Sequence, residues 1–526
     1  MMHDCQHHAL IPRPQANENT CGCCSMSRRS FLGTMVAGTA AMAMGCSRMG
    51  AALKEVNHRE IIDLASLRPQ PKVRIMSAVV RRTPPYWLGW PGTSYPVEGE
   101  RKRYSKVLVE GAGRVGVGFE EEAQPLESAE AVATFVKKIQ AEKPQAVLVH
   151  IQHFGGWPWA GEIAKAGIPT IIFAPIGMSF TGHVKSISRQ PGVHVISSLD
   201  TSAVEQAFRM VRAKHQFEET RLLVVHRNER KEEVIDRLGI KVRHIPRQTF
   251  EELFSQTPET EEAHEVARKR FRHALKIVEP TRKDGLNAAR SFIAAKQLLK
   301  NEGCNAITTD CLGMVGQKKV PTPPCMGASI FQDTGVTYGC EADVFGAASL
   351  MLSSYLFDKP GFMNDPVPET VKNVLIVAHC VCGTRLNDIK REDHEPYILR
   401  NHAESKLGVS MQVLWRKGQR ATLARFQNPK TLIVDTGTVV GNVKTPPAGG
   451  CRTSVELAMD NIEDVRDVLG FHQNVFYGDH RRDLEAFCQM YGIGVIHSPE
   501  HPEQKPAEKS APVEQPKKRA PKAKGA

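Results

Sequence analysis

Short apolar runs alternate with helix-like stretches in the first part of the chain, and this alternation limits the possible folds most strongly. The runs are rich in Val, Ile and Leu, and they are VRIMSAVV, KVLV, AVLVHI, PTIIFA and VHVIS. Helical periodicity falls between or after them, around residues 128–142 and 201–215. Because continuous apolar strands that alternate with amphipathic helices are typical of parallel sheets covered on both faces, the pattern predicts a doubly wound α/β domain over residues 73–215.

The alternation begins again at Arg221 and predicts a second α/β domain over residues 216–370. RLLVVH, KVRHI and NAITTD are strand-like, and helices are expected over residues 261–276 and 286–301. The domain is expected to end with a helix after Tyr338, whose apolar residues recur at helical spacing.

The pattern changes after VLIVAHC. The segment VSMQVLWRKGQRATLARF predicts two strands around a turn at Lys417 and Gly418, and KTLIVDTGTVVGNV continues with β-branched residues. A mainly antiparallel, barrel- or sandwich-like domain is therefore expected over residues 371–498. The predicted fold class is α/β, with two doubly wound α/β domains followed by a β-barrel-like C-terminal domain.

Both ends of the chain are expected to lie outside these domains. Within residues 1–50, Arg28 and Arg29 precede an apolar run that is too short to span a membrane. This arrangement resembles a twin-arginine export signal, which implies passage through the twin-arginine translocase to a periplasmic or otherwise exported location. Cleavage after a small-residue site near Ala43 and anchoring through Cys46 both remain possible. Residues 499–526, rich in Pro, Lys and Ala, predict a disordered basic tail.

Charge and cysteine spacing exclude two common classes of site. The formal net charge is +12, but the basic residues are scattered among acids rather than grouped with aromatic residues, so no nucleic-acid site is expected. HCVCG contains a C-x-C spacing, whereas redox and zinc motifs use C-x-x-C.

A glycine-rich hexapeptide, GAGRVG at residues 111–116, fits the dinucleotide-binding pattern only formally. It follows the strand-like KVLV, but glycine, acidic residues and proline delay the next helix. Dinucleotide binding requires a helix that starts inside the motif, so that its N-terminus meets the pyrophosphate. A flexible loop without a cofactor is therefore expected here.

Four of the five tryptophans occur in two short loops. Trp87 and Trp90 lie in PPYWLGWPG, and Trp157 and Trp159 lie in HFGGWPWAG. Each loop follows a predicted strand, and ligands of open α/β sheets bind beyond the carboxyl ends of strands. The four indoles are therefore candidates for binding a sugar ring, although they could equally fill an interface.

Three carboxylates flank the helix that follows Tyr338. Glu341 and Asp343 precede it, and Asp365 follows it. Because the chain returns after the helix, Glu341 and Asp365 are expected close together, whereas Asp343 is expected mainly to complement the positive end of the helix dipole. Two carboxylates combined with His480, which precedes the last predicted helix, would suit Mn²⁺ or a similar divalent ion.

One long segment carries a family resemblance. The run TTDCLG, then PTPPCMGASIFQDTGVTYGCEADVFGAASLML, PGFMNDP and AHC, resembles the L-fucose isomerase and L-arabinose isomerase-like superfamily. The resemblance implies two α/β domains and a barrel-like domain, a trimer or hexamer, and a monosaccharide substrate.

The resemblance also implies a catalytic site. Mn²⁺ would be bound by Glu341, Asp365 and His480, and the two carboxylates would act as base and acid during aldose–ketose isomerisation. His379 would contact the sugar or supply a further ligand, although it could instead be a core histidine. Two other readings stay open: an exported, non-catalytic carbohydrate-binding protein, and an NAD-dependent oxidoreductase that uses GAGRVG.

Overall fold

The computed structural model describes residues 61–87, 90–444 and 450–500. The predicted signal region and residues 501–526 of the predicted tail lie outside this range. Within it, no helix combines the length and the apolar character that a membrane span requires.

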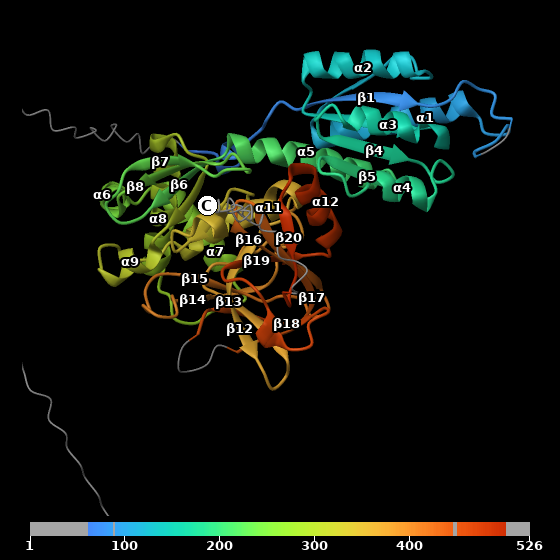
Figure 1. Cartoon of the computed structure of the whole chain (residues 1–526). Coiled ribbons are helices and arrows are strands. Elements are labelled where there is room, and N and C mark those ends of the chain that lie inside the picture. The colour runs from blue at the N-terminus through green and yellow to red at the C-terminus, as the bar shows by residue number, and fades with distance from the viewer. Residues whose placement is uncertain (1–60, 88–89, 445–449, 501–526) are drawn as a thin grey trace, which may run out of the picture. The chain divides into compact units, whose positions relative to one another are not determined.

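The first sheet has five parallel strands in the order β2-β1-β3-β4-β5. Figure 1 labels β1, β4 and β5 of this sheet. Its strands are β1 (Arg74–Val80), β2 (Gly118–Glu121), β3 (Ala146–Ile151), β4 (Thr170–Ala174) and β5 (Val193–Ser197). Its helices are α1 (Val97–Val115), α2 (Ala129–Glu142), α3 (Trp157–Ala164), α4 (Thr181–Ile187) and α5 (Ser202–Glu219), with short 3₁₀ turns at Leu64–Leu67 and Phe154–Gly156.

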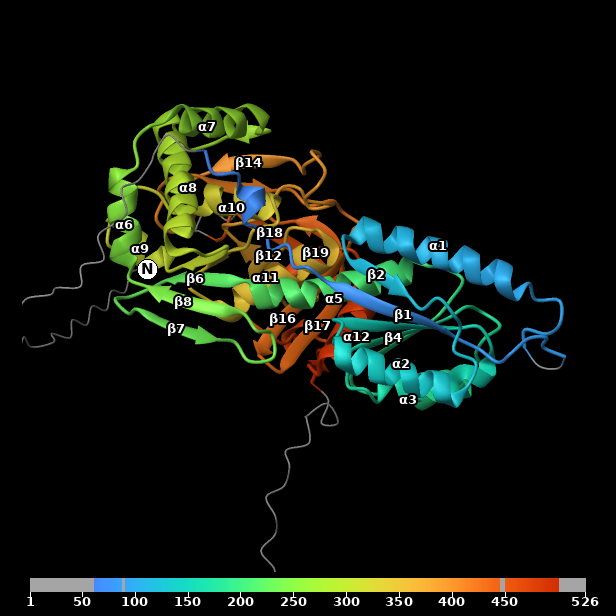
Figure 2. The same ribbon diagram turned by 90° about the horizontal axis from the view of Figure 1, so that it is seen from above.

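Neighbouring residues of β1 face separate cores, which shows that helices cover both faces of this sheet. Ile75 packs in a core with α1 and α5, and Met76 packs in another core with α2 and α3. Figure 2 shows α1 and α2 on opposite sides of β1. Ser128 is the N-cap of α2, since its Oγ accepts a hydrogen bond from the Ala131 N–H.

The prediction for KVLV and GAGRVG was wrong, because both segments belong to α1. Tyr104, Leu108, Ala112 and Val115 form a buried stripe at helical spacing, so Leu108 of KVLV serves the buried face of a helix, whereas Val109 is exposed. Gly116 ends α1 in the left-handed region, with φ 79°. GAGRVG therefore lies at a helix C-terminus, where it cannot form the strand-to-helix turn of a dinucleotide site.

The second sheet has the order β11-β10-β6-β8-β7, and only its edge strand β7 is antiparallel. Its strands are β6 (Arg221–Val225), β7 (Lys231–Val234), β8 (Lys241–Ile245), β10 (Ala306–Thr309) and β11 (Tyr338–Cys340). The helices of this region are α6 (Arg247–Gln256), α7 (Glu261–His273), α8 (Arg282–Glu302), α9 (Cys311–Gly316), α10 (Cys325–Asp333) and α11 (Val344–Phe357). Leu223 packs with α6 and α8, whereas Leu222 packs with α5 and α11, so this sheet is also covered on both faces.

Six antiparallel strands close into a barrel, in the order β16-β19-β12-β13-β18-β17 and back to β16. They are β12 (Phe362–Glu369), β13 (Val374–His379), β16 (Arg420–Asn428), β17 (Thr431–Asn442), β18 (Thr453–Met459) and β19 (Gln473–Tyr477). The 3₁₀ turn Val465–Asp467, helix α12 (Arg481–Tyr491) and strand β20 (Gly494–Ile496), which pairs parallel to β17, complete this part. The predicted α/β class and the β-rich C-terminal part are confirmed, and the barrel takes its first strand from residues upstream of 371.

The two strands predicted around Lys417 and Gly418 exist, but they belong to different sheets. β15 (Ser410–Val413) pairs with β14 (Tyr397–Arg400), which also pairs with β9 (Lys276–Ile277). β16 instead joins the barrel through β17 and β19.

Helix α11 joins the second sheet to the barrel. It follows β11 directly, and its Ser349 Oγ accepts a hydrogen bond from the Phe426 N–H of β16. The Ser349 carbonyl accepts a second hydrogen bond, from Asn474 Nδ2 of β19. These contacts hold the carboxyl end of β11 next to the rim of the barrel.

Candidate metal centre

Glu341 stands at a sharp turn between β11 and α11. Glu341 and Ala342 both adopt positive φ values, 57° and 56°, which non-glycine residues rarely do. Backbone hydrogen bonds hold this turn, from the Ala342 N–H to the Thr309 carbonyl and from the Asp343 N–H to the Cys340 carbonyl. Such backbone strain clusters at functional sites.

Asp343 caps α11, as its position before the helix predicts. Its Oδ1 accepts a hydrogen bond from the Gly346 N–H at 2.8 Å. Gly346 also leaves room for Arg425, because a Cβ at position 346 would lie 3.0 Å from Arg425 Nη1.

Three neighbouring barrel strands supply the other site residues. Asp365 lies on β12 opposite Ala378, the residue before His379 at the end of β13. On the other side of β12, Asn364 pairs with Gln473 of β19, so the residue before Gln473, His472, stands beside Asp365. Asp365, His379 and His472 therefore share one rim of the barrel.

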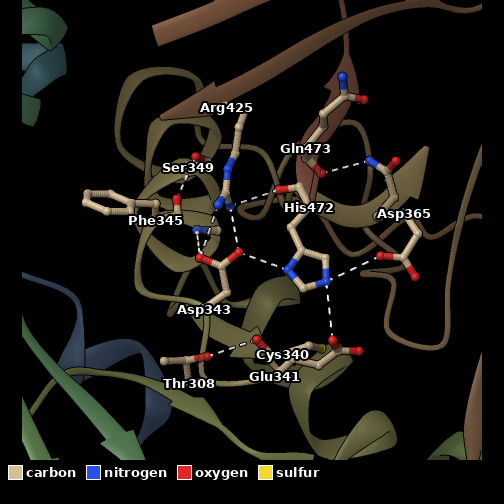
Figure 3. A network of polar contacts seen from close by, with 12 residues as sticks. Thr308, Cys340, Glu341, Asp343, Phe345, Ser349, Asp365, Arg425, His472 and Gln473 are labelled. Carbon is tan, nitrogen blue, oxygen red and sulfur yellow. Dashed lines mark hydrogen bonds and ion pairs between the residues drawn. The ribbon is translucent and has the colours of Figure 1, made fainter. Parts of the chain in front are cut away.

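His472 is the centre of the site (Figure 3). Its Nδ1 lies 2.8 Å from Asp343 Oδ2, and its Nε2 lies 3.3 Å from Asp365 Oδ1 and 3.5 Å from Glu341 Oε2. The other carboxylate oxygen of Glu341 lies 3.7 Å from His379 Nε2. Two carboxylates, one from the sheet and one from the barrel, thus meet at the same imidazole nitrogen.

Arg425 of β16 holds Asp343 and His472 in place. Its Nη1 donates to Asp343 Oδ2 at 2.9 Å and to the His472 carbonyl at 3.3 Å. Asp343 therefore orients the ring of His472 as well as capping α11, whereas the sequence predicted mainly a role in complementing the helix dipole.

The titratable groups at the site perturb one another strongly. The nearby imidazoles of His379 and His472 hold the pKa of Glu341 well below its usual value. Burial alone would raise the pKa of Asp343, but His472 and Arg425 bring it down to about 2. Burial would lower the pKa of His472, yet the three surrounding carboxylates raise it to about 11. In the protein without metal, the cluster thus holds positive charge between its acids.

The donor set fits a divalent cation. One ligand atom each from Glu341, His379 and His472 lies within 4.8 Å of the others. Asp365 Oδ1, His379 Nδ1 and His472 Nε2 are buried atoms without a hydrogen-bond partner among the described residues. Carboxylate oxygens and imidazole nitrogens together suit metals such as Mn²⁺, and the contact from Asp343 to His472 is the outer-shell support that metal-bound histidines have.

His480 lies away from this cluster, which corrects its placement as the histidine partner of Glu341 and Asp365. It stands beyond the opposite end of β19, at the start of α12, and its ring stacks on Phe357 at 4.0 Å between centroids. His472 and His480 flank the same strand, and only the end that carries His472 faces the carboxylates.

The four tryptophans follow strands of the first sheet, but Trp157 and Trp159 lie in helix α3 and not in the predicted loop. Trp87 and Trp90 follow β1 and are exposed, whereas Trp157 begins α3 and is buried. Trp157 Nε1 donates to the Met178 carbonyl, and Trp90 contacts Phe180 edge-on. The contacts of Trp90 and Trp157 are therefore with residues at the edge of the first sheet. The Glu341 cluster, in contrast, is formed by residues of the second sheet and the barrel.

His472, Arg425 and Phe471 are the site residues that sequence reasoning missed. Phe471 stacks on His472 with 4.3 Å between centroids and leaves 58% of its surface exposed, so it presents an apolar face beside the cluster. The segment GFHQNVF places an aromatic residue and a histidine directly before an apolar strand. This pattern could have identified His472 and Phe471 as candidate site residues.

Comparisons with known proteins give one related sequence. No family model matches the chain. The chain is 26% identical over 266 residues to a sulfoquinovose isomerase from Clostridium sp. (strain MSTE9). The match covers 49% of this chain and 58% of that relative, so the chain spans less than two thirds of the relative's length.

Among the solved structures that match, one has the following weak likeness. It is an ABC transporter periplasmic solute binding protein from Actinobacillus succinogenes 130z with bound D-allose, and it is 14% identical. The match covers 48% of this chain and 84% of that chain with a TM-score of 0.16, which supports no inference about fold or ligand.

Proposed function

We propose that this protein is a divalent-metal-dependent aldose–ketose isomerase of the L-fucose and L-arabinose isomerase type. The observation that carries the proposal is the convergence of Glu341, Asp365, His379 and His472, with buried polar atoms that lack partners. The similarity to a sulfoquinovose isomerase supports the same class of reaction and makes sulfoquinovose a candidate substrate.

The two carboxylates match the proton transfer that this reaction needs. Converting an aldose into a ketose breaks the C2–H bond and forms a C1–H bond, while a hydroxyl proton moves from O2 to O1. A carboxylate beside these carbons removes the first proton as a base, and a second group donates at the neighbouring carbon. Glu341 and Asp365 both lie within 3.5 Å of His472 Nε2, so they can flank a small substrate fragment placed there.

Glu341, Asp365 and His472 would hold the cation, with His379 beside them as a sugar contact or a fourth ligand. When bound, Mn²⁺ would polarise the sugar carbonyl and stabilise negative charge that develops on its oxygens. The hydrogen bonds of Asp343 orient His472 for that role, because they engage Nδ1 and leave Nε2 directed at the two carboxylates. His472 must be neutral to ligate, so metal uptake should release protons.

Aromatic groups are the candidates for holding the sugar ring. Phe471 lies beside the cluster, and its exposed face suits the apolar face of a sugar. Trp87 and Trp90 remain candidates at the edge of the first sheet, and Trp157 and Trp159 would support that edge. We further propose a trimer or hexamer, and export through the twin-arginine pathway.

A non-catalytic carbohydrate-binding protein is less well supported. Sugar binding alone needs hydroxyl partners and an apolar platform. It does not need two carboxylates and two imidazoles gathered around atoms that lack hydrogen bonds, which is the arrangement at Glu341 and His472.

The proposal is tested by turnover of defined sugars. Metal-free protein is reloaded with Mn²⁺ and incubated with a panel of aldoses that includes L-fucose, L-arabinose and sulfoquinovose, and ketose formation is followed by ¹³C NMR. Turnover should require the metal and should be lost in Glu341→Gln. The matched control is Glu110→Gln, which alters an exposed glutamate of α1 and should keep wild-type activity. Failure to convert any sugar while Mn²⁺ is bound would contradict the proposal.

A further inference from the structure

Four residues follow the ends of four adjacent strands in the second sheet. Glu341 follows β11, Asp310 follows β10, His226 follows β6, and Arg247 comes two residues after β8. These strands are parallel neighbours, with Val225 paired to Thr309 and Thr309 paired to Cys340. The four side chains therefore originate in a row along one edge, which is where open α/β sheets bind ligands.

The far end of this row is basic. Arg247 Nη1 donates to Asp310 Oδ2 at 2.8 Å, and His226 Nδ1 lies 3.3 Å from the same oxygen. Asp310 Oδ1 is engaged elsewhere, because it accepts from the Gly313 N–H. A Cβ at Gly313 would lie 1.8 Å from Arg247 Nη1, so the glycine makes the close approach of the guanidinium possible.

Arg227 follows His226 directly in the chain and adds a second arginine at this end of the row. Arg227 is exposed, and its side chain has no hydrogen bond or ion pair with any residue in the described part of the chain. Its φ is 48°, an unusual value for arginine, and its carbonyl accepts a hydrogen bond from the Arg247 N–H. Arg227 and Arg247 together outweigh the single carboxylate of Asp310.

The separation between Glu341 and His226 matches a hexose chain. Adjacent strands lie about 4.8 Å apart, so His226 and Glu341 originate about 10 Å apart. With C–C bonds of about 1.5 Å, an extended six-carbon chain with a terminal sulfur or phosphorus group spans about 8 Å. A sugar whose C1 and C2 lie at Glu341 can therefore place a substituent at C6 near Arg227 and Arg247.

We propose that His226, Arg227 and Arg247 form a subsite for an anionic oxyacid group, a sulfonate or a phosphate, at C6 of an aldohexose substrate. This inference rests on the proposed isomerase function and adds the substrate class. Guanidinium groups bind such oxyanions through two parallel hydrogen bonds. Arg247 uses one donor on Asp310 and keeps others available, and Arg227 keeps all of its side-chain donors.

The test compares hexoses that differ only at C6. Values of kcat/KM are measured for the C6-sulfonate, the C6-phosphate and the uncharged 6-deoxy sugar, and the ratio of charged to uncharged substrate is the readout. The ratio should favour one anion by about tenfold or more, and Arg227→Gln and Arg247→Gln should each reduce it by about tenfold. The two charged sugars show which oxyacid fits. Arg221→Gln, at the opposite end of β6, should leave the ratio unchanged.

Calorimetric titration with the corresponding unreactive sugar alcohols supplies a readout independent of turnover. The wild-type protein should bind a charged alcohol more tightly than the 6-deoxy alcohol, and Arg227→Gln should remove that preference. Arg227 is exposed, so this variant remains informative if Arg247→Gln fails to fold. Equal binding of charged and uncharged alcohols would overturn the subsite, whether or not any sugar is isomerised. If the protein isomerises sugars but binds charged and uncharged alcohols equally, the isomerase assignment stands and the subsite is wrong. If it prefers the charged alcohol but isomerises no sugar, the subsite stands and the isomerase assignment is wrong.

Discussion

Replacing Asp343 with Asn should weaken divalent-metal binding although Asp343 touches no metal position itself. Its Oδ2 accepts from His472 Nδ1 at 2.8 Å and from Arg425 Nη1 at 2.9 Å, and its Oδ1 caps the Gly346 N–H. Asparagine has a single acceptor oxygen. If that oxygen caps Gly346, the amide nitrogen faces two other donors, and if it faces His472, the cap of α11 is lost.

The expected losses of metal affinity and of folding stability follow from the hydrogen bonds that Asp343→Asn removes. Removal of an outer-shell partner of a metal-bound histidine typically costs about 10- to 100-fold in metal affinity, which corresponds to about 1.4–2.7 kcal/mol. A lost hydrogen bond to a charged group costs about 1.5–3 kcal/mol of stability. Asp343→Asn should therefore weaken both metal binding and folding, and the protein should remain folded at room temperature.

Calorimetric titration of Mn²⁺ into metal-free protein measures the first effect, and urea unfolding measures the second. Asp284→Asn is the matched control, because Asp284 caps α8 through Thr281 and lies in a different helix. The control should lose stability and keep its Mn²⁺ affinity. If Asp343→Asn bound Mn²⁺ within about twofold of wild type, the orienting role of Asp343 would be refuted.

Three further predictions concern the histidine at the site, a buried aspartate and the export signal. His472→Asn should abolish stoichiometric Mn²⁺ binding in calorimetry, whereas His480→Asn should retain it; equal loss in both would contradict the assignment. Asp358→Asn should lower the free energy of unfolding at neutral pH by about 3–5 kcal/mol, because Asp358 is buried among cationic side chains. Burial alone would raise the pKa of Asp358, but these cations hold it below 3.8, so its contribution is present above about pH 4 and is lost as the pH falls through its folded pKa. Urea unfolding at several pH values should show the difference between variant and wild type shrinking in acid, and a constant difference would argue against this. Replacing Arg28 and Arg29 together with Lys should retain the protein in the cytoplasm upon cell fractionation, and normal export would oppose the signal assignment.

Local sequence signals predicted the positions of the strands better than they predicted which strands pair with one another. The apolar runs of β3 and β4 are buried at every position, and such runs are recognisable without knowledge of the fold. KVLV was misassigned because its three apolar residues are too few to distinguish a helix from a strand. The closure of the barrel depends on pairing between β16 and both β17 and β19, and no local pattern encodes such distant pairing.

The candidate site was predicted in the same uneven way. Glu341 and Asp365 were recognisable because one helix connects them, so their proximity depends on local structure. His472 was missed because it reaches the site through the pairing of β19 with β12, and because His480 stands beyond the other end of the same strand. The role of Asp343 was underestimated for a similar reason, since its partners His472 and Arg425 come from the barrel.

Crystals soaked in Mn²⁺ test the central claim most directly, since anomalous scattering at the manganese absorption edge locates the ion without reference to activity. The account predicts one strong peak within coordination distance of Glu341, Asp365 and His472, and its loss in Asp365→Asn crystals grown under the same conditions. A peak at His480, or no peak near Glu341 at a concentration of Mn²⁺ that supports turnover, would contradict it.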